Sequence, residues 1–124
     1  MAHKGKTHLN YVIICPEDQV DEGDRIFRSH GKWMERTHHR SGPKALLTYE
    51  VSKAPELTNP MDTSSGKTGN MVYVLTEVYE SEAGVADHFE QAQSGWEDFA
   101  ALGEWLRKCT MYGVPQAPII NSLW

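Results

Sequence analysis

The sequence has little cysteine: only Cys15 and Cys109 are present, and each lies in an apolar segment. Two cysteines are too few for a disulfide-rich scaffold, and no Cys-x-x-Cys spacing points to a thiolate metal site. We therefore interpret both as reduced residues of a hydrophobic core. This use of cysteine predicts a cytoplasmic protein.

An excess of positive charge is also absent. The 124 residues include 12 basic and 17 acidic side chains, with a formal net charge of −5. Nucleic acids and anionic lipid surfaces are bound through clustered Lys and Arg, so this composition argues against both as partners. No apolar run approaches the ~20 residues that cross a bilayer. The sequence thus predicts no nucleic-acid and no membrane partner.

The length predicts one domain. Residues 1–7 are polar and predict a flexible tail ahead of a single domain at 8–124. Segment 53–70 is rich in Pro, Ser, Thr, Asn and Gly, which predicts a long loop. The hydrophobic patterns and turn signals elsewhere predict, in chain order, a strand at 8–14, a helix at 17–39, strands at 45–51 and 71–80, a helix at 81–109 capped by Ser81 and interrupted at Gly95, and a strand at 119–124.

This order is β-α-β-β-α-β, the ferredoxin-like pattern. It predicts an α+β fold in which a four-stranded antiparallel sheet carries its helices on one face. Strand 71–80 has apolar side chains on both faces, with Tyr73 and Leu75 on one and Val72 and Val74 on the other. A sheet that is apolar on both faces is covered on both. We therefore predict a homodimer through the free sheet face, forming a dimeric α/β barrel.

The first helix directs polar and aromatic groups inward. At about 100° per residue, one arc holds Ile26, Phe27, His30, Trp33, Met34, Thr37 and His38. Either a packed core satisfies the polar groups of this arc, or the arc lines a cavity. In a cavity, His30 would be the natural general base or hydrogen-bond donor, and Trp33 would supply a flat wall for an aromatic ligand.

Glu77 shares a strand face with apolar neighbours, and a buried carboxylate there needs a partner. His88 lies at the edge of the apolar arc of the second helix. The two residues are either a structural hydrogen-bonding pair or part of a catalytic group with His30. The candidate substrate-binding residues are Trp33, Met34, Thr37, His38, Tyr49, Tyr73, Tyr79 and Trp96.

The sequence predicts neither a metal site nor a cofactor. His30 and His38 are ~12 Å apart along the helix, too far for one ion. His38 and the adjacent His39 point in different directions. Three residues, His30, Glu77 and His88, could meet in space, but no motif requires them to bind a metal.

The segment 74–83, followed by His88, resembles the antibiotic biosynthesis monooxygenase-like families. Their third strand reads Glu-x-Tyr/Trp before an acidic turn, an Ala and a helical His, and Glu77, Tyr79 and Ala83 occupy the corresponding positions here. The resemblance implies a small dimeric α+β barrel. Its members include cofactor-free oxygenases of polycyclic phenols and haem-degrading enzymes. Tyr79 stands where the haem-degrading branch has Trp.

Three functions remain open. The first is a cofactor-free, monooxygenase-like enzyme for a phenolic or conjugated apolar substrate, with His30 as base and Tyr49, Tyr73 or Thr37 as donors to an oxyanion. The second is a binding or sensing protein that holds an apolar or fatty-acid-like ligand without turnover. The third is a structural dimer whose histidines only satisfy polar groups of the core.

Overall fold

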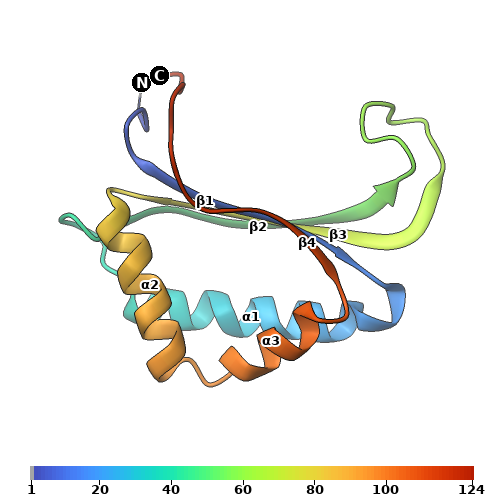
Figure 1. Cartoon of the computed structure of the whole chain (residues 1–124), viewed down its shortest axis with the longest axis horizontal. Coiled ribbons are helices and arrows are strands. Elements are labelled where there is room, and N and C mark those ends of the chain that lie inside the picture. The colour runs from blue at the N-terminus through green and yellow to red at the C-terminus, as the bar shows by residue number, and fades with distance from the viewer. Residues whose placement is uncertain (1) are drawn as a thin grey trace.

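The computed structural model describes residues 2–124 and contains one four-stranded sheet with helices on one face (Figure 1). Its elements follow the chain as β1 (Thr7–Cys15), the 3-10 turn η1 (Glu17–Gln19), α1 (Val20–Thr37), β2 (Leu46–Leu57), β3 (Lys67–Tyr79), α2 (Glu82–Gly95), α3 (Phe99–Leu106) and β4 (Thr110–Pro118). The strand order is β2-β3-β1-β4, and each neighbouring pair is antiparallel. The predicted α+β class and antiparallel sheet are confirmed, and the order is compatible with a ferredoxin-like fold.

The two central strands form most of the inner sheet surface. β1 and β3 pair from Thr7 opposite Tyr79 to Cys15 opposite Met71. Successive side chains of a strand alternate between faces. The helix-facing side chains of this pair are therefore buried together: Leu9, Ile13, Cys15, Tyr73, Leu75, Glu77 and Tyr79.

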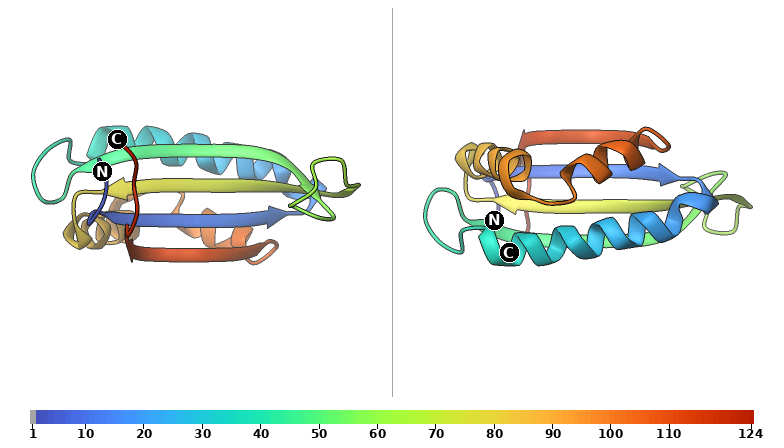
Figure 2. Two further views of the ribbon diagram at one scale, coloured as in Figure 1. Left: turned by 90° about the horizontal axis from the view of Figure 1, so that it is seen from above. Right: turned by 90° about the horizontal axis from the view of Figure 1, so that it is seen from below.

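The helices divide the inner face between them. α1 runs beneath the β2–β3 side of the sheet, whereas α2 and α3 lie toward β1 and β4 (Figure 2). The inward arc predicted for the first helix is confirmed for Ile26, His30, Trp33 and Met34, which are all buried. In the part of the chain described here, no helix is both long enough and apolar enough to pass through a membrane.

A glycine lets α2 approach the end of β3. A Cβ atom added to Gly84 would lie 2.6 Å from Tyr79 Cδ1 and 3.0 Å from the carbonyl oxygen of Lys44. A side chain at this position would therefore push the helix away from the sheet. Because His88 follows about one helical turn later, the close approach brings its ring near β3.

The predicted loop at 53–70 is wrong at both ends. β2 continues to Leu57 and β3 begins at Lys67, so the connection spans only 58–66. β2 is an edge strand, where Pro55 does not interrupt a central ladder. Most side chains of its second half are exposed, so no apolar period marks the strand in the sequence.

The predicted last strand at 119–124 is also wrong, because β4 spans Thr110–Pro118. β4 is the other edge strand, so it tolerates a register shift and the residues Gly113-Val114-Pro115, a combination typical of a turn. Gly113 adopts φ 138°, a conformation that favours glycine. Ile119 instead forms backbone hydrogen bonds of 2.9 Å with Gly5 and with Lys6.

The start of the chain is partly ordered by these contacts. Thr7, predicted to belong to a flexible tail, is the first residue of β1 and is buried. The remaining tail residues that the structure describes form turns, and Met1 lies outside them. Ser81 occupies the predicted N-cap of α2, but its hydroxyl donates to the Pro43 carbonyl at 2.5 Å instead of capping the helix.

Candidate functional site

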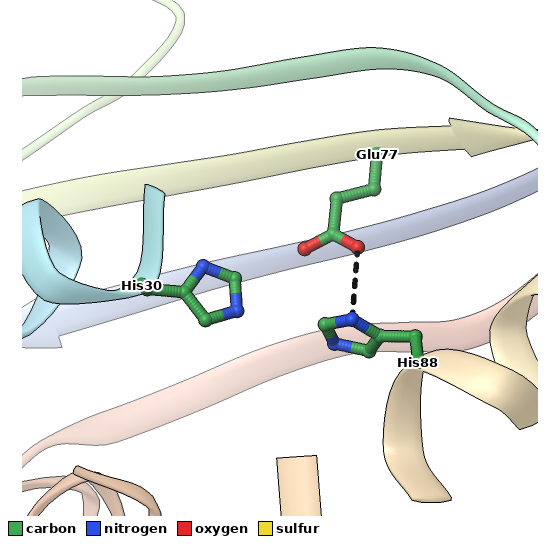
Figure 3. Close-up of side chains that lie close together, drawn as sticks. All are labelled: His30, Glu77 and His88. Carbon is green, nitrogen blue, oxygen red and sulfur yellow. Dashed lines mark ion pairs between the residues drawn. The ribbon is translucent and has the colours of Figure 1, made fainter. Parts of the chain in front are cut away.

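Three buried side chains from three elements meet between the sheet and the helices (Figure 3). His30 comes from α1, Glu77 from β3 and His88 from α2. One nitrogen or oxygen atom of each lies within 4.8 Å of those of the other two. The Glu77 Oε1 atom is 3.9 Å from His88 Nδ1. The fold therefore brings together the three candidate catalytic residues of the sequence.

Glu77 is fully buried, and its two carboxylate oxygens differ. Oε1 accepts a hydrogen bond of 2.5 Å from the Tyr79 hydroxyl. Oε2 is buried and has no hydrogen-bond partner among residues 2–124. Burial raises the pKa of Glu77 to about 7, although the hydrogen bond from Tyr79 opposes this shift. The carboxyl group therefore changes protonation near neutral pH, and one of its oxygens is free to bind.

A chain of hydrogen bonds orients the second histidine of the group. The Thr37 hydroxyl donates to the Trp33 carbonyl at 2.8 Å, so it accepts at 3.0 Å from His38 Nδ1. His38 Nε2 then accepts from His88 Nδ1 at 2.8 Å. This network assigns the ring proton to Nδ1 in both histidines. It leaves a lone pair on Nε2 of His88.

Burial keeps the inner histidines neutral. Burial, with a smaller contribution from neighbouring imidazoles, lowers the pKa of His30 to about 4 and that of His88 to about 3. Burial also lowers the pKa of His38 to about 4. His30 Nδ1 lies 3.0 Å from the Tyr49 hydroxyl. At neutral pH these rings can accept a proton or donate a lone pair to a metal.

Aromatic rings surround this polar cluster of His30, His38, Glu77 and His88. Trp33 stacks on Trp96 with ring centroids 5.6 Å apart. Trp96 also meets the His30 ring edge-on at 5.0 Å. These large apolar surfaces exclude water from the cluster and strengthen the electrostatic interactions within it.

A cavity of about 720 Å³ adjoins the polar cluster between the sheet and the helices. His30 and His88 supply its buried polar lining, and Gln93, Glu104 and Arg107 are exposed at its rim. Most of its wall is apolar, including Leu9, Tyr11, Phe27, Leu75, Phe89 and Trp96. Its size lies within the range of roughly 300–1,000 Å³ found for small-molecule sites.

The predicted binding residues fall into different places. Trp96 lines the cavity, as predicted. The prediction that Trp33 forms its wall is wrong, because Trp33 packs behind Trp96 and is only 2% exposed. Phe27 and Trp96 form an aromatic wall instead. When two indole rings stack at a cavity wall, only one of them faces the cavity. The periodicity of one helix does not show which of the two rings this is.

Three further candidates line a separate hollow of about 270 Å³ between α1 and β2, namely Met34, His38 and Tyr49. The remaining candidates use their hydroxyls inside the protein. Tyr73 donates to Asp24 Oδ1 at 2.7 Å, and Thr37 and Tyr79 make the bonds described above. These hydroxyls are therefore occupied in the described structure.

Sequence reasoning did not identify the contribution of α2 and α3 to the cavity wall. Phe89 and Leu102 both line it. The available signal was the spacing of apolar residues on these helices, which is the same for a packed face and for a face beside a cavity. Sequence reasoning also missed the hydrogen bond between His38 and His88, since these residues lie on different elements.

No protein-family model, curated protein or solved structure matches this chain. The resemblance of residues 74–88 to the antibiotic biosynthesis monooxygenase-like families therefore stays a prediction. The polar cluster and the cavity beside it are the features of the molecule that bear on its function.

Proposed function

We propose that the protein binds a small, largely apolar molecule in the cavity between the sheet and the helices. The observation that carries this proposal is a cavity of about 720 Å³ with an apolar wall and two buried, neutral imidazoles at one end. The rings of Phe27 and Trp96 favour a conjugated body. His30 and His88 favour one polar group on that body, placed to form a hydrogen bond.

A second candidate is cofactor-free oxygenation of a phenolic substrate, the activity implied by the resemblance to the monooxygenase-like families. In this reaction a base removes a proton from an activated CH₂ group, and the carbanion reduces O₂ to a hydroperoxide. Loss of water then leaves a ketone, so CH₂ and O₂ become C=O and H₂O. The position of the neutral His30 ring on the cavity wall supports its role as base, with Glu77 and His88 beside it.

Binding without turnover is favoured by a different observation. The low pKa of the His30 ring, about 4, makes it a weak base. Its Nδ1 atom is already engaged with the Tyr49 hydroxyl. We therefore place ligand binding first and oxygenation second.

The binding proposal is tested with 1-naphthol, followed by tryptophan fluorescence. Gly103 is an exposed residue of the cavity lining and has open space where a Cβ would stand, so Gly103→Leu places a large side chain at the cavity wall. We expect saturable binding to the native protein and at least a tenfold loss (~1.4 kcal/mol) in Gly103→Leu. Gly95→Leu is the matched control, because Gly95 also has open space but does not line this cavity.

Equal binding by both glycine variants, or no binding by the native protein, would contradict the cavity as the ligand site. Oxygenation is tested separately by incubating the protein with anthrone and measuring O₂ consumption and ketone formation. We expect consumption at one O₂ per ketone if the enzyme proposal holds. Bound anthrone that consumes no O₂ would exclude this oxygenation and leave the binding function.

We also propose that the protein acts as a homodimer through the outer face of the sheet. Val12, Ile14, Val72 and Val74 point away from the helices and remain partly exposed, and Tyr112 on β4 is 63% exposed. Contiguous apolar patches on a soluble protein mark interaction surfaces. A second copy of the same sheet would cover this one symmetrically, which is the commonest arrangement of oligomers.

The dimer is tested by light scattering on Tyr112→Glu. We expect twice the chain mass of 14.0 kDa for the native protein and the single mass for the variant. Met61→Glu is the control, because Met61 is 91% exposed in the loop at 58–66 and lies outside the proposed interface. A native protein of single mass would contradict the proposal.

A further inference from the structure

We infer that His30, Glu77 and His88 bind a divalent transition-metal ion. Two imidazoles and one carboxylate are the protein ligands of many mononuclear zinc and non-haem iron(II) sites, which keep coordination positions open for a ligand. Here the three side chains come from α1, β3 and α2 and are 5%, 0% and 5% exposed. Metal binding does not require an organic ligand, so this inference goes beyond the proposed function.

The geometry of the three side chains suits one ion. Their ligand atoms lie within 4.8 Å of one another. Bonds of about 2.0–2.2 Å to a tetrahedral ion separate neighbouring ligand atoms by roughly 3.5 Å. Closing the set around an ion therefore requires side-chain movements of about 1 Å, which small χ rotations provide. The His88 atom that lies 3.9 Å from Glu77 is Nδ1, which His38 already binds, so coordination through Nε2 also requires a turn of the His88 ring.

The unpaired oxygen of Glu77 is an independent observation that points to a ligand. Glu77 Oε2 is buried and has no partner within residues 2–124. An unsatisfied buried oxygen costs free energy, and each such group in a folded protein calls for an explanation. In Figure 3 the oxygen that is not joined to His88 lies on the side of His30. An ion between these side chains would supply the missing partner.

The charge of Glu77 is also left without a counterion. Within the described residues its only basic partner is His88, at 3.9 Å, and that ring is neutral at neutral pH. A buried carboxylate needs either a proton or a positive charge. A divalent cation bound by neutral imidazoles neutralises the carboxylate and leaves one positive charge, which an anionic ligand in an open coordination position would balance.

Each of the three side chains has an outer hydrogen-bond partner, as metal ligands usually do. The Tyr49 hydroxyl holds His30 Nδ1, and His38 Nε2 holds His88 Nδ1. The Tyr79 hydroxyl holds Glu77 Oε1. The network places the proton of His88 on Nδ1, so its Nε2 atom keeps the lone pair that a metal requires. His30 offers its Nε2 lone pair in the same way when its Nδ1 atom donates to the Tyr49 hydroxyl.

The same site defines the ligand class more closely, and this part rests on the proposed function. Since His30 and His88 line the cavity, the open positions of their ion face it. The apolar molecule would then carry an oxygen donor, such as a phenolate, that binds the ion. The aromatic wall of Phe27 and Trp96 would hold its conjugated body.

The metal site is tested by calorimetric titration of chelator-treated protein with Zn²⁺, and with Co²⁺ as a spectroscopic probe of coordination. We expect one ion per chain. Glu77→Gln keeps the side-chain size but removes the charge. We expect the affinity of this variant for the metal to fall by more than about 100-fold, because the loss of a residue that only hydrogen-bonds to a metal ligand already costs 10- to 100-fold. His39→Gln should bind as the native chain does, because His39 is exposed and is not one of the three ligands.

Three results would overturn the metal site. One is a native protein that does not bind Zn²⁺ or Co²⁺ at millimolar concentration, which would mean that a proton occupies Glu77. Another is a folded Glu77→Gln variant, checked by circular dichroism, that binds the metals as tightly as the native chain. The third is a loss of binding confined to His39→Gln, which would identify surface binding.

The ligand class is tested by comparing 1-naphthol with naphthalene in the presence and absence of Zn²⁺. We expect Zn²⁺ to raise the affinity for 1-naphthol at least tenfold and to leave that for naphthalene unchanged. Equal affinity of 1-naphthol in both conditions would overturn coordination by the ligand. Zn²⁺ binding without binding of either probe refutes the proposed function alone, and probe binding without Zn²⁺ binding refutes the metal site alone.

Discussion

The two ends of the interior differ in both chemistry and packing. Beneath β3, between α1 and α2, four titratable side chains and two stacked indoles pack together. Beneath β1 and β4, toward α3, apolar side chains surround a cavity of about 720 Å³. His30 and His88 belong to both ends. The titratable groups are therefore held by hydrogen bonds and ring packing in one end, while the space for a ligand lies in the apolar end beside them.

The largest expected effect is on the packed end. Trp33 contacts His30, His38, His88 and Trp96. Trp33→Ala should lower the free energy of unfolding by about 3–5 kcal/mol, because it leaves a void that these neighbours cannot fill. Urea denaturation measures this loss. Leu102→Ala, beside the existing cavity, should cost less than about 2 kcal/mol, and equal losses would show that the two ends do not differ in packing.

The second effect is acid unfolding of the metal-free protein. Burial lowers the folded-state pKa of His30 and His38 to about 4 and of His88 to about 3, so the unfolded chain binds more protons below pH 6.5. Stability should therefore fall as the pH drops from 6.5 toward 4. Glu77 acts in the opposite direction, since its raised pKa stabilises the fold as the pH falls from 7. We expect a net loss of at least about 2 kcal/mol between pH 7 and 4.5.

Urea midpoints across this pH range measure the acid effect. His88→Gln removes the side chain with the largest of the three shifts and should flatten the profile. An unchanged pH dependence in a folded His88→Gln variant would show that this ring does not stay neutral in the native state.

The third effect is a stabilisation. Glu77→Gln removes a buried charge with an unpaired oxygen and should raise the free energy of unfolding of the metal-free protein at pH 8 by about 1–3 kcal/mol. The gain should shrink at pH 5, because the folded-state pKa of about 7 means that Glu77 is protonated there. Thermal unfolding at the two pH values checks this, and a loss of stability at pH 8 would contradict it.

The smallest effect is at the apolar end. Gly103 lies inside α3, and a Cβ there meets no atom within 4 Å. Gly103→Ala should therefore stabilise the protein by about 0.5–1 kcal/mol through helix propensity alone. Thermal unfolding measures it. A destabilised Gly103→Ala variant would show that the cavity wall at α3 is already tightly filled.

Some features of the fold and of the site follow from the sequence alone. The inward position of His30 follows from the 3.6-residue period of α1, and that of Glu77 from the alternation of β3, because both patterns depend only on neighbours along the chain. The second half of β2 and all of β4 were missed. Edge strands with exposed side chains carry no apolar alternation, so their hydrogen bonds leave no trace in the sequence.

The sequence by itself determined the α+β class, the element order and the inward direction of His30 and Glu77, since local periodicity decides these. Only the tertiary structure decided that His88 joins them, that Trp96 rather than Trp33 faces the cavity, and that one nitrogen or oxygen atom of each of the three side chains lies within 4.8 Å of the others. The reason is physical. Side chains from different elements meet only if the helices approach the sheet closely enough. Contacts between residues far apart in the sequence, such as that of Gly84 with Tyr79, set this distance.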